Sequence, residues 1–129
     1  MLLIKGETLN RVQIGKEYEE MAAAHLISRG MNLVMRNFRC KRGEIDLIGI
    51  HKGCLVFVEV KYRRDNSRGA AEEAVGVSKQ KKICHTSDYF RISYKQYQRM
   101  QVRYDVVTVT ENQINWYQNA FPYQGSGGW

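Results

Sequence analysis

This sequence has little proline, few cysteines and no long hydrophobic run. Of its 129 residues one is proline, 43% are hydrophobic and 26% are charged, which excludes a collagen-like or disordered chain and suits one compact domain. Cys40, Cys54 and Cys84 cannot all pair within the chain and lack zinc-ligand spacing, so we expect reduced thiols and a cytoplasmic protein. The most apolar stretch, residues 54–58, is too short to span a bilayer, and the N-terminus lacks the apolar segment of a signal peptide. We therefore expect neither secretion nor membrane insertion.

The positive charge is concentrated in the middle of the chain. The net charge is +7, and residues 61–103 carry eleven basic and four acidic residues, whereas residues 104–129 carry two acidic residues and no basic one. A basic segment with interspersed rings is typical of a nucleic-acid partner, because cations bind phosphates and bases stack on rings. The alternative is a solvated basic face that only confers solubility. The rings of this segment include Tyr62, Tyr89, Phe90, Tyr94 and Tyr97.

Periodicity and turn residues predict a single α/β domain over residues 1–121, followed by a flexible tail over residues 122–129. The predicted order is αβββαββ, and a helix between the third and fourth strands permits a right-handed crossover, so we expect a mixed β-sheet flanked by helices. Residues 65–76 lack periodicity and are expected to form a mobile loop. The predicted helices are residues 10–30 and 78–92, the latter with Ser78 as its N-cap, and the predicted strands are residues 31–39, 44–51, 54–63, 102–110 and 113–118.

A glutamate and a lysine lie two residues apart at the end of the third predicted strand. Because side chains alternate between the faces of a strand, Glu59 and Lys61 share a face. Asp46 lies thirteen residues before Glu59, a separation at which a hairpin brings the two carboxylates side by side. A carboxylate among apolar residues needs a compensating cation, and oxygen ligands favour Mg²⁺ or Mn²⁺ over zinc. The alternative is a solvated salt bridge or an edge-strand charge.

Two further acidic residues are candidates for the same place. Glu19 lies at the margin of the apolar stripe of the first predicted helix, where it reaches toward the sheet. Its alternative role is that of an ordinary boundary residue in a helix. Glu44 is predicted to share a face with Asp46 and Ile48, where it either supports the metal ligands or binds metal itself.

Several short motifs, in order and spread over nearly the whole chain, carry a family resemblance. The chain resembles the YraN-like family of uncharacterised bacterial proteins. That family is similar to the archaeal Holliday junction resolvases and, through them, to the PD-(D/E)xK nucleases, which have a restriction-endonuclease-like core. The motifs are Gly15-x3-Glu19-x2-Ala22, Arg36-Asn37-x-Arg39, Gly-Glu-Ile-Asp-Leu-Ile at residues 43–48, Val-Phe-Val-Glu-Val-Lys-x-Arg at residues 56–63, Lys79, Arg-Tyr-Asp-Val-Val at residues 103–107, and Ala120-Phe121.

The resemblance implies a role for each candidate residue. It makes Asp46 and Glu59 ligands of Mg²⁺ or Mn²⁺, with Glu19 as the acid from the helix that completes the metal site. Lys61 becomes the catalytic lysine. Gln80, on the second predicted helix, resembles the polar residue that such nucleases direct at the site. The implied activity is metal-dependent hydrolysis of phosphodiester bonds in DNA.

The expected substrate is branched or structured DNA, with RNA as the other polymer to consider, because nothing in the sequence resembles a helix that reads the major groove. A junction resolvase needs two sites, so a homodimer is also expected. The rival functions are a non-catalytic nucleic-acid-binding module on the same fold and a protein-interaction domain. The residues expected to bind nucleic acid are Arg63, Arg64, Arg68, Lys79, Lys81 and Lys82.

Overall fold

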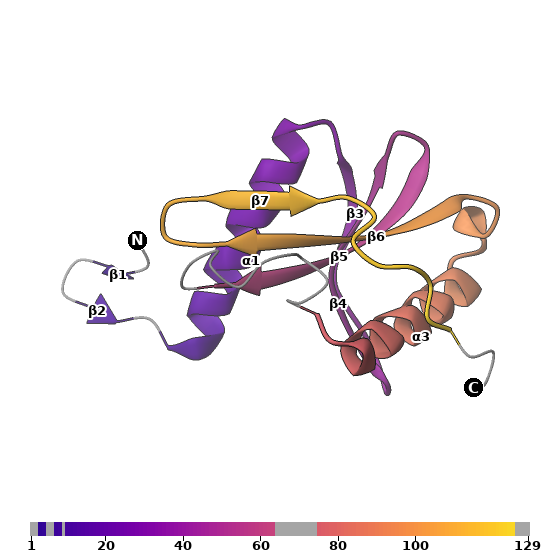
Figure 1. Ribbon diagram of the computed structural model, residues 1–129, viewed down its shortest axis with the longest axis horizontal. Helices are drawn as coiled ribbons and strands as arrows, with labels where there is room; N and C mark the ends of the chain where they lie inside the picture. Colours follow the sequence, from indigo (N-terminus) through magenta and orange to yellow (C-terminus); the bar gives the residue numbers. More distant parts are fainter. Residues whose placement is uncertain (1–2, 5–6, 9, 64–74, 126–129) are drawn as a thin grey trace.

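The computed structural model of this chain describes residues 3–4, 7–8, 10–63 and 75–125. It is an α/β fold in which a five-stranded mixed sheet carries one helix on each face, an architecture compatible with a restriction-endonuclease-like core (Figure 1). The strand order is β3-β4-β5-β6-β7, and β5 and β6 run parallel because α3 connects them, while the other neighbouring strands of this sheet are antiparallel. The elements are β1 (Leu3–Ile4), β2 (Glu7–Thr8), α1 (Arg11–Ser28), β3 (Asn32–Cys40), β4 (Gly43–His51), β5 (Cys54–Tyr62), α3 (Val77–Ser93), the 3-10 helix η1 (Lys95–Tyr97), β6 (Gln101–Val109) and β7 (Ile114–Tyr117).

The predicted order αβββαββ and the mixed sheet are confirmed. The hairpin β1–β2 and the helix η1 lie outside that prediction. The predicted N-cap of the second long helix is wrong, because Gly76 occupies that position with an extended backbone and Ser78 lies inside the first turn. The loop predicted over residues 65–76 falls outside the described residues, except for Val75 and Gly76.

Helix α1 has a well-defined start and end. Asn10 accepts a hydrogen bond from the backbone of Gln13, whose side chain accepts one from the backbone of Asn10, so two otherwise unpaired N–H groups are satisfied. Gly30 follows the helix with a φ of +100°, which is a conformation that glycine adopts without strain. Among the described residues, neither helix combines the length and the apolar composition that crossing a bilayer requires.

Two apolar clusters hold the helices on the sheet. Against α3 the core is rich in aromatic residues, and Phe90 packs edge-on against Phe57 with ring centroids 5.8 Å apart. Against α1 the core is built from small and aliphatic side chains, including Ala22 and Leu26 of the helix. The predicted alternation of β5 is confirmed, because Phe57 belongs to the α3 cluster and Val58 to the α1 cluster.

The side-chain alternation of β4 is broken around Asp46. Ile45 and Ile48, three residues apart, both pack in the α3 cluster, whereas Leu47 packs in the α1 cluster. The predicted shared face of Glu44 and Ile48 is therefore wrong. Opposite this break, Asn37 of β3 stands between the pairs Arg36↔Leu47 and Phe38↔Ile45 with a φ of +52°. This distortion interrupts the ladder opposite Asp46 and leaves its carboxylate at an irregular point of the sheet.

Candidate active site

Asp46, which is half-buried, and Glu59, which is buried, form a carboxylate pair where β4 and β5 separate. The paired register of these strands runs from His51↔Cys54 to Leu47↔Val58, and the two acids follow immediately beyond its end. The backbone N–H of Val60 donates to Asp46 Oδ2 at 2.8 Å, which orients that carboxylate. Glu59 is 8% exposed. The predicted meeting of Asp46 and Glu59 therefore takes place in a site largely withdrawn from water.

The electrostatics of this pair are unfavourable without a cation. Burial, followed by the charge of Glu59, raises the pKa of Asp46 from 3.8 to about 8. The charge of Glu19 and a side-chain hydrogen bond with Glu59 raise it further, and the hydrogen bond from Val60 opposes the rise. At neutral pH the pair is thus a place where either a proton or a positive charge is favoured.

Lys79 supplies one positive charge to the pair. Its Nζ lies 3.5 Å from Glu59 Oε2, with the lysine side chain about half exposed and that of Glu59 10% exposed. The lysine belongs to the first turn of α3, which begins beside the end of β5. Lys79 was predicted to contact nucleic acid, and the structure places it at the carboxylate pair. The signal that points to this role is its presence in the family motifs, since helical periodicity alone does not relate Lys79 to Glu59.

Lys61 continues the face of Glu59 at the end of β5. It pairs in register with Thr108 of the parallel strand β6 and is exposed. Strand alternation places its side chain on the same side of the sheet as Glu59, one step farther toward solvent. Lys61 and Lys79 therefore lie at the solvent side of the carboxylate pair, coming from a strand and a helix.

Glu19 approaches the pair from α1 without joining it. Asn37 Nδ2 donates to Glu19 Oε1 at 2.9 Å, so the same residue that distorts β3 also holds this acid. The neighbouring Glu20 forms an ion pair with Arg36. Glu19 acts on Asp46 through its charge. Asn37 is a residue that the sequence analysis missed as part of the site; its place in the Arg36-Asn37-x-Arg39 motif and the tolerance of asparagine for positive φ are the signals that indicate it.

Gln80 and Glu44 have other partners. Gln80 is buried, and its side-chain N–H donates to the carbonyl of Val75 at 2.8 Å. Its Oε1 accepts a hydrogen bond from the side chain of Gln124 at 3.0 Å. Glu44 forms an ion pair with Arg39 at 2.6 Å. The structure therefore brings neither of these two side chains to Asp46 and Glu59 through a described contact.

The predicted nucleic-acid contacts fall into three groups. Lys81 and Lys82 lie exposed on α3, close in sequence to Lys79. Arg63 follows β5, and its backbone N–H donates to Val109 at 2.9 Å. Arg64 and Arg68 lie outside the described residues.

The donor set of the pair fits Mg²⁺ or Mn²⁺. Such ions are commonly bound by one or two carboxylates, with water and phosphate oxygens as the remaining ligands. A cation between Asp46 and Glu59 would offset the repulsion that raises the pKa of Asp46. Within residues 10–63 and 75–125, no group of three or more histidine, cysteine and acidic side chains is close enough to hold a metal. The two-carboxylate set, without Glu19 as a direct ligand, is the arrangement that this geometry supports.

The raised pKa of Asp46 predicts a pH-dependent stability in the presence of a chelator. Because the folded state holds this proton more tightly than the unfolded state, the contribution is fully present below about pH 4 and is lost as the pH rises through about 8. We expect the free energy of unfolding to fall by a few kcal/mol over this range, on the order set by the shift. Urea unfolding of wild type and Asp46→Asn between pH 5 and 9 measures the difference. A difference that does not change with pH would contradict this prediction.

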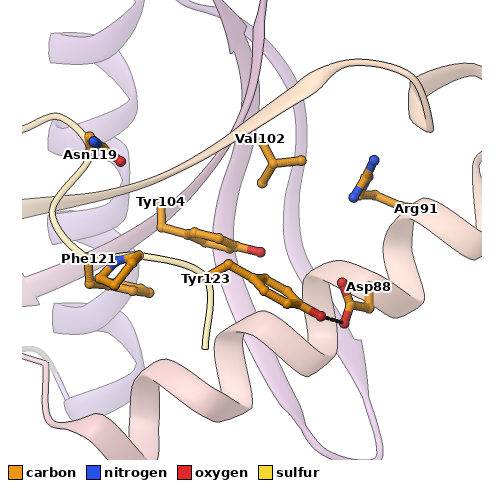
Figure 2. A pocket seen from close by; sticks show the side chains of 8 residues that line it. Asp88, Arg91, Val102, Tyr104, Asn119, Phe121 and Tyr123 are labelled. Carbon is orange, nitrogen blue, oxygen red and sulfur yellow. Dashed lines mark hydrogen bonds between the residues drawn. The ribbon is translucent and has the colours of Figure 1, made fainter. Parts of the chain in front are cut away.

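A pocket that the sequence did not predict lies at the far end of α3 (Figure 2). Its volume is about 390 Å³, and aromatic rings from β6 and the C-terminal segment form one wall. Tyr104 stacks on Phe121 at 5.4 Å, and the hydroxyl of Tyr123 donates to Asp88 at 2.5 Å. Tyr123 and Gln124, from the segment predicted to be a flexible tail, thus contact α3. The hydrogen bonds of these residues tie the C-terminal segment to the same helix that carries Lys79.

Comparison with known proteins gives a consistent family match. The model of the uncharacterised protein family UPF0102 matches residues 18–109, a range that contains the carboxylate pair and both lysines. A UPF0102 protein of Saccharophagus degradans is 40% identical over 109 residues, covering 84% of this chain and 92% of the relative. A UPF0102 protein of Lachnoclostridium phytofermentans is 37% identical and covers 92% of this chain and 100% of the relative. One from Pseudomonas fluorescens is 36% identical, with 87% and 95% covered.

Proposed function

We propose that this chain, which belongs to the uncharacterised protein family UPF0102, is a Mg²⁺- or Mn²⁺-dependent nuclease that hydrolyses phosphodiester bonds in branched or structured DNA. The observation that carries the proposal is the Asp46–Glu59 pair, with Glu59 buried and with Lys61 and Lys79 at the solvent side. Acidic side chains that require a cation, next to ammonium groups that attract phosphate, form a combination suited to phosphoryl transfer.

In the proposed reaction, two acids and two lysines of this chain would have different roles. Asp46, oriented by the N–H of Val60, and Glu59 would hold the cation. When bound, a divalent cation neutralises charge on the scissile phosphate and makes water more acidic. Lys61 would donate hydrogen bonds to the phosphate oxygens and stabilise the negative charge that grows on them in the transition state. Lys79 would keep Glu59 in position and add positive charge at the same phosphate.

Positive charge around the pair supports a polyanionic substrate. Arg63 follows β5, and Lys81 and Lys82 lie exposed on α3, so each is close in sequence to a lysine at the pair. Phosphate contacts by such side chains position a nucleic acid without reading its sequence. Through such contacts the protein would recognise the shape of a DNA branch point and not its base sequence. Cutting both strands of a junction needs two sites, so the proposal includes a homodimer in the cytoplasm, where the described free cysteines stay reduced.

A cleavage panel tests the proposal. Wild-type protein is incubated with a labelled four-way junction, a flap, a duplex, single-stranded DNA and RNA in Mg²⁺, Mn²⁺ or chelator. We expect DNA products only with a metal, and fastest on a branched or flapped substrate. Intact substrates under all conditions, with binding that does not depend on metal, would instead support a non-catalytic nucleic-acid-binding module. If the protein binds none of these nucleic acids at any salt concentration, a protein-interaction domain would be supported.

A further inference from the structure

Two basic hollows lie between α3 and the turn that joins β3 to β4. Both are lined by Lys41 and Arg42 of this turn. The larger, of about 470 Å³, is completed by Ser78, Lys81, Lys82 and His85 of α3. The smaller, of about 330 Å³, is completed by Arg39, Cys40 and Tyr89. Every lining residue that carries a charge at neutral pH is basic. Because the two hollows share Lys41 and Arg42 and both lie beside α3, we treat them together as one cationic groove.

Close packing of the β3–β4 hairpin on α3 fixes the two sides of the groove. Gly43 packs tightly on α3, because a Cβ atom there would lie 3.1 Å from Thr86 Oγ1 and 3.6 Å from the Cβ of Lys82. Cys40 Sγ lies 3.6 Å from the same Thr86 hydroxyl. These contacts fix Lys41 and Arg42 opposite the lysines of α3. Their mutual repulsion favours a bound anion between the two elements.

An aromatic ring stands at the far end of the groove. The Tyr89 side chain is 44% exposed, and its ring is supported by Phe38 at a centroid distance of 6.1 Å. From Ser78 to Tyr89 the helix advances about 16 Å at 1.5 Å per residue. A cationic groove that leads to an exposed ring suits a single strand, because unpaired bases offer a face for stacking whereas paired bases do not.

We propose that this groove binds a single-stranded DNA segment, with its phosphates on Lys41, Lys81 and Lys82 and a base stacked on Tyr89. Lys79 belongs to the same turn of α3 as Lys81 and Lys82 and touches Glu59. The groove therefore borders the turn of α3 whose Lys79 contacts the carboxylate pair. This inference rests on the proposed function for its substrate, and it narrows branched or structured DNA to substrates with an unpaired arm.

Binding measured in a chelator tests the groove separately from cleavage. Fluorescence anisotropy with an oligothymidine and with a hairpin duplex compares wild type with the double variant Lys41→Gln/Lys82→Gln. Its matched control is Lys16→Gln/Lys52→Gln, which removes two exposed lysines from α1 and the β4–β5 turn. The slope of log K against log salt for the oligothymidine is negative, and we expect the groove variant to reduce its magnitude by about 1.4. We expect the control to leave this slope nearly unchanged. An equal reduction of this slope in the groove variant and in the control would overturn the proposal.

The ring gives a second, independent readout. We expect Tyr89→Ala to weaken oligothymidine binding by about 5- to 100-fold and Tyr89→Phe to restore it, because phenylalanine keeps the stacking face. Thermal unfolding of both variants checks that the fold persists. Unchanged binding in a folded Tyr89→Ala, or wild-type binding that is tighter to the duplex than to the oligothymidine, would overturn the assignment. Since no step depends on metal, a failure here leaves the nuclease proposal standing, and an absence of cleavage leaves the groove proposal standing.

Discussion

Asp46→Asn is expected to lower metal-dependent DNA cleavage by about 10³-fold while leaving DNA affinity in chelator within a factor of two or so. Asparagine keeps the size of the side chain and can still accept the hydrogen bond from Val60 N–H. It removes the negative charge that the cation needs at this position. Single-turnover cleavage of the best substrate in Mn²⁺, together with anisotropy in chelator, measures the two effects on one protein preparation.

The control for Asp46→Asn is Glu17→Gln. Glu17 lies exposed on α1, and its substitution removes one carboxylate charge at a distance from the pair. We expect wild-type cleavage from this variant. Cleavage by Asp46→Asn within about tenfold of wild type, in a folded protein, would show that the phosphodiester bond is broken without this carboxylate and would contradict its proposed role.

The largest loss of stability is expected at a different acid, Asp105. This residue of β6 is fully buried and accepts two hydrogen bonds from Arg103, at 2.9 Å each, and one from Trp116 Nε1 at 2.8 Å. The backbone N–H of Asn119 donates to it at 2.9 Å. Asp105→Ala would leave Arg103, whose side chain is 12% exposed, and two further donors without this acceptor. We expect the free energy of unfolding to fall by about 3–5 kcal/mol, measured by urea denaturation.

Glu111→Ala is the matched comparison for Asp105→Ala. Glu111 is an exposed acid in the turn between β6 and β7, where its removal is expected to change the free energy of unfolding by less than about 0.5 kcal/mol. A loss below about 1 kcal/mol for Asp105→Ala would mean that the network around Asp105 contributes little to the fold. Asp105 is thus an acid whose charge is compensated by donors of the protein itself. In the Asp46–Glu59 pair, by contrast, two acids lie close enough to repel each other.

The order of the elements could be predicted because each one carries its own local signal. Asn10 and Gly30 bracket α1, and the two faces of β5 follow from strict alternation. The convergence of Asp46 and Glu59 could also be predicted, because the length of a hairpin determines which residues meet across it. These inferences rely on neighbours in sequence or on a single tight connection.

Features that depend on tertiary packing could not be predicted in the same way. Whether Lys79 or Gln80 faces the carboxylates depends on the rotation of α3 about its axis, which the packing of Phe90 and Ile83 against the sheet decides. The break in β4 lies opposite Asn37 of the neighbouring strand, whose positive φ no alternation pattern reveals. The groove beside α3 depends on the close approach of Gly43 to that helix, which no periodicity reveals.

Calorimetric titration of Mn²⁺ into the metal-free protein, without DNA, tests most directly whether the Asp46–Glu59 pair is a cation site. The account predicts saturable binding to wild type that weakens at least tenfold in Asp46→Asn and in Glu59→Gln and is unchanged in Glu17→Gln. It also predicts tighter binding at pH 8.5 than at pH 6.5, because a proton on Asp46 competes with the cation. Equal Mn²⁺ binding by wild type and both site variants, or no binding to wild type at either pH, would contradict the assignment of this pair as the metal site of a nuclease.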